Sequence, residues 1–198
     1  MRPLFDAKGS LIAVTKPAFP TIVPQEIERI ISAIDPEQVE ALMQAITDAG
    51  SVFVCGAGRS LLMMQAFAMR LVHLGMEAYV VGETITPAIK PGNLLIAGTG
   101  SGETRVTLAM IDAAHARDAR TCALTAHAQS AIGKACDLVV EIPTPVTVAA
   151  DVVRLSVQPP GSLFEQCLLV LCDTMTMLFM QRLGVTEEQM RARHTKLE

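Results

Sequence analysis

Aromatic residues are scarce in this 198-residue sequence, which contains no tryptophan and a single tyrosine. Hydrophobic residues nevertheless make up 51% of the chain. The core must therefore be aliphatic, which is typical of proteins in which helices cover buried strands. Positive charge is not in excess either, since 16 Lys and Arg against 20 Asp and Glu give a net charge of −4. We therefore expect no nucleic-acid or membrane partner, although backbone N–H groups can still hold a small phosphate.

Further absences concern disulfides, metals and membrane spans. The five cysteines are odd in number and show no CxxC spacing, which favours reduced, buried thiols in a cytoplasmic protein. No two histidines have metal-ligand spacing with a carboxylate, so we expect no metal site. The N-terminus shows no signal-peptide pattern. Charged residues interrupt the two most apolar stretches, residues 61–72 and 162–180, and we expect neither to span a membrane.

The chain shows no internal repeat and no low-complexity linker, so we interpret residues 1–198 as a single domain. Residues 1–50 are expected to form an N-terminal arm and helices, and residues 51–198 the sheet core and the C-terminal helices. Residues 1–24 contain four prolines and no clear period. They predict an arm that packs on the surface or on a partner subunit.

The segment that follows this arm carries signals of a helix start and end. Asp35 predicts an N-cap, Pro36 suits the first helical position, and Gln38 stands at the third. Gly50 predicts the end of this helix.

From residue 51 onward, short β-rich runs alternate with helical stretches. Strands are predicted at residues 51–55, 77–81, 93–97, 121–125 and 137–141. Helices are predicted at about residues 58–74, 103–117 and 161–183, the last after a loop over residues 143–160. This alternation predicts an α/β fold: a doubly wound, flavodoxin-like parallel sheet of five strands, flanked by helices. Its ligand should lie beyond the carboxyl ends of the strands.

The strongest local signal is Thr99-Gly100-Ser101-Gly102-Glu103-Thr104, at a predicted strand-to-helix junction. Glycines let the backbone approach a ligand, hydroxyls are neutral donors, and a helix N-terminus offers unpaired N–H groups to an anion. No lysine follows the glycines, which argues against a triphosphate loop and favours a single phosphate monoester. The alternative is an ordinary capped turn, with Ser101 as N-cap and Thr104 as the third helical residue.

A second glycine-rich junction, Gly56-Ala57-Gly58-Arg59-Ser60, follows the first predicted strand. It nearly matches the dinucleotide fingerprint, but Leu61 replaces the third glycine, so nucleotide binding is the weaker alternative. Two such loops, after the first and third strands, instead predict the two sides of one small anionic ligand. Arg59 can make a bidentate contact with a phosphate or a sugar oxygen, and its alternative is a surface salt bridge.

Together these residues resemble the sugar isomerase (SIS) domain family and, within it, the 6-phospho-3-hexuloisomerases. The matching motifs are Gly58–Ser60, Phe67–Leu71, His73–Gly75, Val81–Pro87, Ser101–Thr104, Gly161–Glu165 and Arg193–His194. The Ser-Gly-Glu-Thr loop is typical of all SIS domains. The Gly-Glu-Thr-Ile-Thr-Pro loop and the Arg-His pair near the C-terminus are more specific to the hexuloisomerases.

The resemblance implies roles for particular residues. Loop hydroxyls of the family bind the sugar phosphate, a glutamate early in the last long helix is the catalytic base, and a histidine, often from a neighbouring subunit, assists at the sugar hydroxyls. Glu165 and His194 hold the last two places. The predicted substrate- and phosphate-binding residues are Arg59, Ser60, Thr99, Gly100, Ser101, Gly102, Glu103 and Thr104. Two positions depart from the family pattern. Family members commonly have glycine where this chain has Leu61, and serine where it has Thr99. Threonine, like serine, carries a hydroxyl, so phosphate binding is still expected at position 99.

The implied reaction needs one partly desolvated carboxylate. Moving a ketone from C3 to C2 removes a carbon-bound proton and returns one at the neighbouring carbon, and one carboxylate can do both through a cis-enediol without metal or cofactor. Glu165, beside Phe164 and aliphatic residues, suits this task, and its alternative is a solvated acid on a helix face. Glu103 is a rival base, although the helix dipole favours an acid in a first turn for structural reasons alone.

The resemblance thus implies a 6-phospho-3-hexuloisomerase, which interconverts D-arabino-hex-3-ulose 6-phosphate and D-fructose 6-phosphate. It also implies a homo-oligomer, tetramer or dimer, and a role in formaldehyde fixation by the ribulose monophosphate pathway or in pentose-phosphate supply. The alternatives are another SIS isomerase, such as one acting on arabinose 5-phosphate, and a non-catalytic sugar-phosphate sensor.

Overall fold

Seven helices and five strands make up the part of the chain that the computed structural model describes, residues 19–145 and 156–196. The strands are β1 Val52–Gly56, β2 Ala78–Val80, β3 Leu94–Thr99, β4 Arg120–Thr125 and β5 Leu138–Glu141. The helices are α1 Phe19–Ile31, α2 Pro36–Asp48, α3 Gly58–Leu74, α4 Arg105–His115, α5 Ala131–Ala135, α6 Ser162–Leu183 and α7 Glu187–Arg193. The five predicted strands are all present, with bounds that differ from the prediction by one or two residues.

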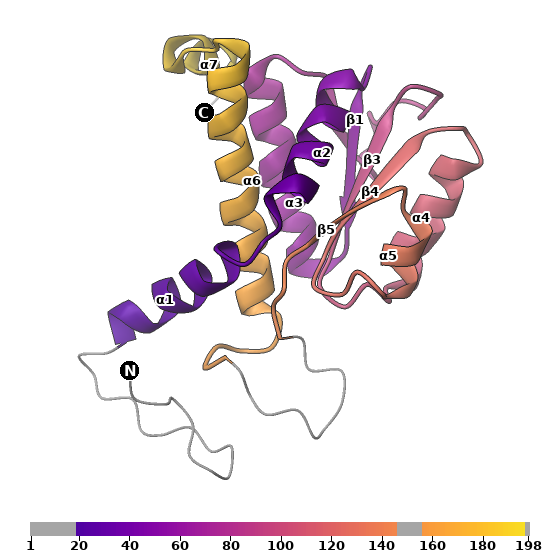
Figure 1. Cartoon of the computed structure of the whole chain (residues 1–198). Helices are drawn as coiled ribbons and strands as arrows, with labels where there is room; N and C mark the ends of the chain where they lie inside the picture. The colour runs from indigo at the N-terminus through magenta and orange to yellow at the C-terminus, as the bar shows by residue number, and fades with distance from the viewer. Residues whose placement is uncertain (1–18, 146–155, 197–198) are drawn as a thin grey trace.

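The five strands are parallel and lie in the order β2-β1-β3-β4-β5. Gly56 at the end of β1 pairs in register with Gly98 of β3, which pairs with Leu124 of β4. The direction of strand addition reverses between β1 and β3, and such a switch point opens a crevice beyond the carboxyl ends of the two strands. The predicted fold, a doubly wound five-stranded sheet flanked by helices, is confirmed (Figure 1).

Successive side chains of the strands face two separate hydrophobic layers, because neighbouring residues of a strand point to opposite faces. Val52 and Val54 pack with buried residues of α2, α3 and α6. Phe53 and Cys55 pack in the other layer, with buried residues of α4 and α5. Figure 1 shows these two groups of helices on opposite sides of the sheet. Burial on both faces explains why the strands are visible in the sequence as continuous apolar runs.

Helix α2 begins where the sequence predicts it. Oδ1 of Asp35 accepts a hydrogen bond from the backbone N of Glu37 at 2.9 Å, and Pro36 is the first helical residue. Gln38 holds the third position but its side chain does not close the cap. Its Oε1 accepts from the backbone N of Glu141 at 2.8 Å, so Gln38 ties α2 to the end of β5.

Helix α1 corrects the prediction of a surface arm over residues 1–24. That prediction is wrong for residues 19–24, which are helical, while the residues before them lie outside the described part of the chain. Ile22 and Glu26, four residues apart on the helix, are both buried. This buried face stabilises a helix in spite of Pro24 in its interior, because tertiary packing outweighs helix propensity.

Helix α7 is a second element that the sequence analysis missed, although its start carries a recognisable signal. Oγ1 of Thr186 accepts from the backbone N of Gln189 at 3.2 Å, and Oε1 of Gln189 accepts from the backbone N of Thr186 at 2.9 Å. This is a capping box. At the other end of α7, a guanidinium N–H of Arg193 donates to the carbonyl of His73 at 2.9 Å and fastens α7 to the end of α3.

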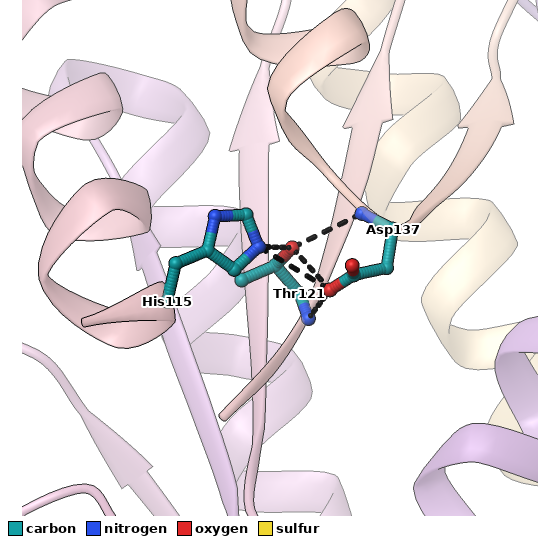
Figure 2. Close-up of polar contacts among 3 residues, drawn as sticks. All are labelled: His115, Thr121 and Asp137. Carbon is teal, nitrogen blue, oxygen red and sulfur yellow. Dashed lines mark hydrogen bonds and ion pairs between the residues drawn. The ribbon is translucent and has the colours of Figure 1, made fainter. Parts of the chain in front are cut away.

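A polar cluster of His115, Thr121 and Asp137 lies at the amino-terminal edge of the sheet (Figure 2). Oδ2 of Asp137 accepts hydrogen bonds from the backbone N of Thr121 at 2.8 Å and from its hydroxyl at 2.9 Å. Nε2 of His115 lies 2.8 Å from the Thr121 hydroxyl oxygen and 3.3 Å from Oδ2 of Asp137. The cluster therefore joins the end of α4 to the first residues of β4 and to the residue before β5.

We expect Asp137→Asn to lower the stability of the protein at neutral pH but not in acid. Burial raises the pKa of Asp137, but hydrogen bonds from Thr121 and His115 outweigh burial and hold it below its ordinary value of 3.8. A depressed pKa in the folded state contributes stability that is present at neutral pH and is lost as the pH falls through that pKa. Because the carboxylate is half exposed, the free energy of unfolding should fall by only about 1 kcal/mol.

Urea denaturation at several pH values measures this difference. The wild type and the variant should differ at pH 7 and converge once the pH lies below the pKa of Asp137. A difference that persists unchanged in acid would contradict the electrostatic explanation.

Candidate active site

A cavity of about 210 Å³ lies at the carboxyl ends of β1 and β3, at the switch point of the sheet. Its walls come from the start of α3, the loop between β3 and α4, and the first turn of α6. The residues that line it are Ala57, Ser60, Gly98, Thr99, Gly100, Ser101, Thr104, Gly161, Phe164 and Glu165. The fold thus brings six of the predicted site residues to one place: Ser60, Thr99, Gly100, Ser101, Thr104 and Glu165.

Two glycines of the loop after β3 lie in close packing contacts. A Cβ atom at Gly100 would lie 3.2 Å from the ring of Phe164 in α6. Gly102 has a φ of +68°, and a Cβ atom there would lie 1.9 Å from Oγ of Ser130. The absence of side chains lets α6 and the loop before α5 approach β3.

The hydroxyls of this loop are oriented by backbone amides. Oγ1 of Thr99, which is buried, accepts from the backbone N of Gly102 at 3.2 Å, and Oγ of Ser101 accepts from the backbone N of Glu103 at 3.3 Å. Since both oxygens act as acceptors, their protons remain to be donated to ligand oxygens. Thr104 is the N-cap of α4 and makes no side-chain capping bond. The alternative in which Ser101 is the N-cap is therefore wrong.

Glu165 lies in the first turn of α6, and its side chain is only 13% exposed. The turn is set by Gly161, which has a φ of +86° and whose carbonyl accepts from the backbone N of Glu165 at 3.1 Å. The carboxylate borders the cavity. Its burial does not fit the alternative of a solvated acid on a helix face, and partial desolvation is what abstraction of a proton from carbon requires.

Arg59 contacts this carboxylate from the start of α3. Its Nε donates a hydrogen bond to Oε2 of Glu165, although the two residues are 106 positions apart in the sequence. The Arg59 side chain is 61% exposed and does not line the cavity. The guanidinium balances the charge of a largely buried carboxylate.

Glu103 and Gly102 do not line the cavity. Oε1 of Glu103 accepts from the backbone N of Ala131 at 3.0 Å, at the start of α5. This contact gives Glu103 a structural task between two helices. The geometry therefore favours Glu165 over Glu103 as the base.

His194 lies far from Glu165 within one chain. Its ring contacts that of His73 in a tilted arrangement, with centroids 5.1 Å apart, at the C-terminal end of α3. Ser60 stands at the other end of α3, about 20 Å away at about 1.5 Å per residue. Figure 1 shows α7 beyond the C-terminal end of α6, and His194 directly follows α7, whereas Glu165 is in the first turn of α6. A single chain therefore does not bring His194 to the cavity.

His73 and His194 border a second, larger cavity of about 410 Å³ between α3, α6 and α7. Burial lowers the pKa of His73, and the neighbouring His194 and Arg70 lower it further. His73 is therefore neutral at pH 7. Arg70 and Asp173 line the same cavity as the two histidines, and they form an ion pair between α3 and α6.

Among the described residues, no cysteine or histidine lines the cavity near Glu165. Burial raises the pKa of Cys55 and of Cys167 to about 12, and that of Cys136 to about 11, so these thiols are protonated and inert as nucleophiles. The five cysteines are all free. Within residues 19–145 and 156–196, no group of three or more His, Cys, Asp or Glu side chains is arranged to hold a metal ion.

Some lining residues were not predicted as site residues. Gly161 and Phe164 border the cavity, as do Ala57 and Gly98. A glycine immediately before a long helix was a usable signal for Gly161. Phe164 lies at the cavity because α6 crosses the end of β3, and no local pattern predicts that crossing.

The model of the SIS domain matches residues 45–166 of this chain. The chain belongs to the SIS domain family. The resemblance seen in the motifs is thereby confirmed. The SIS match contains both glycine-rich loops and reaches the first turn of α6, so it includes every residue that lines the cavity.

Relatives within the family are similar over most of their length. A 3-hexulose-6-phosphate isomerase of Bacillus subtilis (strain 168) is 37% identical over 173 residues, which cover 87% of this chain and 94% of the relative. A 3-hexulose-6-phosphate isomerase of Mycobacterium gastri is 37% identical over 178 residues, 90% of this chain and 89% of the relative. The crystal structure of a Methanococcus jannaschii protein, from which a function of 3-hexulose-6-phosphate isomerase was inferred, matches with a TM-score of 0.80 at 29% identity, over 91% of this chain and 99% of that one.

Proposed function

We propose that this SIS protein is a 3-hexulose-6-phosphate isomerase, which interconverts D-arabino-hex-3-ulose 6-phosphate and D-fructose 6-phosphate. The observation that carries the proposal is a carboxylate, Glu165, that is 13% exposed and borders a hydroxyl-lined cavity at the switch point of the sheet. The relatives named for this activity are 37% identical over most of both chains, which supports the same substrate. This substrate belongs to the ribulose monophosphate pathway.

The phosphate is held by hydroxyls and backbone amides. Ser60, Thr99, Ser101 and Thr104 line one cavity and come from the two loops at the carboxyl ends of β1 and β3. The amides at the start of α4 add unpaired donors and the positive end of the helix dipole. A phosphate fixed in this way positions the carbon chain of the sugar, so that its reactive carbons reach the carboxylate.

Glu165 then moves one proton between two neighbouring carbons. Its carboxylate removes the proton from C2 of the 3-ulose, and the electron pair of that C–H bond forms the C2–C3 double bond of a cis-enediolate, with the charge on O3. The O2 proton passes to O3, and Glu165 returns its proton to C3, which leaves the ketone at C2. Arg59, which contacts Oε2 of Glu165, lies beside the carboxylate to compensate negative charge during these steps.

The substrate has no low-energy ring form to open. Its C6 oxygen carries the phosphate, and closure of O5 on C3 would give a strained four-membered ring. The enzyme therefore needs no ring-opening acid. We assign His194 to orienting a sugar hydroxyl, and we place it in the site of a neighbouring subunit, since it lies about 20 Å from its own.

A homo-oligomer is part of the proposal. Several large apolar side chains on α3 and α6 are exposed in the single chain: Leu62, Met69, Val72, Val170, Met177 and Leu178. Among the described residues one helix, α6, is long and apolar enough to cross a membrane by length and composition alone, but half of its most apolar window is buried within the protein. Helix α6 also carries two acids, Glu165 and Asp173, and α3 packs along it, which does not suit a membrane span. We therefore propose that the protein is cytoplasmic and that a second copy covers the outer face of α6.

A coupled assay tests the function. The protein is given D-arabino-hex-3-ulose 6-phosphate, and formation of D-fructose 6-phosphate is followed through a downstream dehydrogenase. D-arabinose 5-phosphate is offered in parallel, and formation of its ketopentose phosphate isomer is measured separately. We expect turnover of the hexulose phosphate alone. Turnover of arabinose 5-phosphate instead would support another SIS isomerase, and binding of either sugar without turnover would support a sensor.

A further inference from the structure

A buried carboxylate of α1 fastens the segment that leads into α6. Glu26 is only 4% exposed. Its Oε2 accepts hydrogen bonds from the hydroxyl of Ser156 at 2.8 Å and from Nε2 of Gln158 at 2.9 Å, and its Oε1 accepts from the backbone N of Val157 at 3.0 Å. Three donors from three consecutive residues thus converge on one carboxylate, more than 100 positions away in the sequence.

The segment is stiff between this anchor and the candidate base. Gln158 is followed by Pro159 and Pro160, whose rings fix φ near about −65°. The carbonyl of Pro159 accepts from the backbone N of Ser162 at 3.1 Å. Gly161 then starts the turn that holds Glu165. A displacement of Gln158 is therefore passed on to the first turn of α6 instead of being absorbed by a flexible loop.

Helix α1 also packs against α6 itself. The negative charge of Glu26 adds to burial in raising the pKa of Cys167, which is two residues beyond Glu165 on the same helix. The segment before α6 and the second turn of α6 are thus both held near one carboxylate of α1.

From these contacts we infer that Glu26 is a positioning residue for the isomerase: it holds residues 156–158, and through the two prolines it sets the place of Glu165 at the cavity. Helix α1 is accordingly part of the support of the active site. This inference rests on the proposed function, because it assigns Glu26 to the proton-transfer geometry. The phosphate-binding hydroxyls lie on β1 and β3 loops and do not depend on Glu26.

The test replaces Glu26 by leucine, which keeps the volume at a buried position and removes all three acceptors. We expect kcat to fall about tenfold, because a misplacement of about 1 Å can cost up to about 100-fold in rate. KM should stay within about threefold of the wild type, since phosphate binding supplies most of the affinity. Glu26→Gln keeps at least one acceptor and should restore most of kcat. Glu28→Leu, the same change on the exposed face of α1, is the matched control and should leave kcat unchanged.

Hydrogen exchange of the full-length protein supplies a readout that does not depend on turnover. Peptides that contain residues 156–165 should exchange faster in Glu26→Leu than in the wild type, while peptides of β1 and β3 should not change. Gln158→Leu should cause no further loss of kcat in the Glu26→Leu background, because the contact is already broken. If Glu26→Leu is merely less stable and keeps its kcat, or if exchange at residues 156–165 is unchanged, the positioning role is wrong. A wild type without isomerase activity would instead reject the proposed function, and the exchange result would still decide whether Glu26 holds the segment.

Discussion

Replacing Glu165 by glutamine is expected to lower kcat by about 100- to 10,000-fold, the range typical for loss of a general base. Glutamine has the shape of glutamate and keeps an oxygen that can accept from Nε of Arg59, so the fold and the cavity should persist. It cannot take a proton from carbon. The affinity for D-fructose 6-phosphate, measured by calorimetry, should change by less than about threefold, because the phosphate donors lie on other loops.

Glu103→Gln is the comparison that separates the two candidate carboxylates. The glutamine oxygen can still accept from the backbone N of Ala131, so this variant should keep its fold. We expect its kcat to fall far less than that of Glu165→Gln. A large loss in Glu103→Gln together with an active Glu165→Gln would exchange the roles of the two residues and overturn the mechanism.

The strands of the sheet were predictable because each one is marked by its own short stretch of sequence. Strands buried on both faces are short apolar runs, and glycines such as Gly75, which has a φ of +94°, mark where helices end. Helix α1 was not predictable in this way. Its prolines argue against a helix, and the decisive stabilisation comes from packing of Ile22 and Glu26 against parts of the chain that are far away in sequence.

The sequence predicted that the loops after β1 and β3 form the candidate site together. It did not predict the side-chain contacts within that site. Parallel strands bring their carboxyl ends to one edge, so the loops that carry Ser60 and Ser101 had to lie near each other once the strand order was known. The pairing of Arg59 with Glu165 spans 106 positions and depends on how α6 packs on α3. For Glu103, the sequence left catalytic and structural roles open, and its contact with Ala131 and its absence from the cavity lining distinguish them.

If His194 acts in the site of a neighbouring subunit, as proposed above, its position predicts a specific arrangement of subunits. Helix α6 has 22 residues, which is about 33 Å of helix, with Glu165 in its first turn and α7 beyond its last. If two copies pack about a two-fold axis with their α6 helices antiparallel, the start of one α6 lies beside the end of the other. The exposed apolar side chains of α6 lie along its length, which suits such a contact. Each site would then combine Glu165 of one copy with His194 of the other.

Mixing two inactive variants tests this arrangement. Glu165→Gln and His194→Ala are each expected to be at least about 100-fold slower than the wild type. When the two are coexpressed and random pairing occurs, half of the dimers are mixed, and one of the two sites in each mixed dimer has both residues. Activity should therefore recover to about a quarter of the wild type, measured by the coupled assay at equal total subunit concentration.

The double variant Glu165→Gln/His194→Ala provides the control for this recovery. Mixed with Glu165→Gln it has no glutamate to contribute, so no site is complete in any pairing and activity should stay at the background. If both residues acted within one chain, every site in the first mixture would also lack one of them, and coexpression would restore nothing. Recovery in the first mixture and not in the second therefore requires a site built from two chains, as the proposed role of His194 predicts.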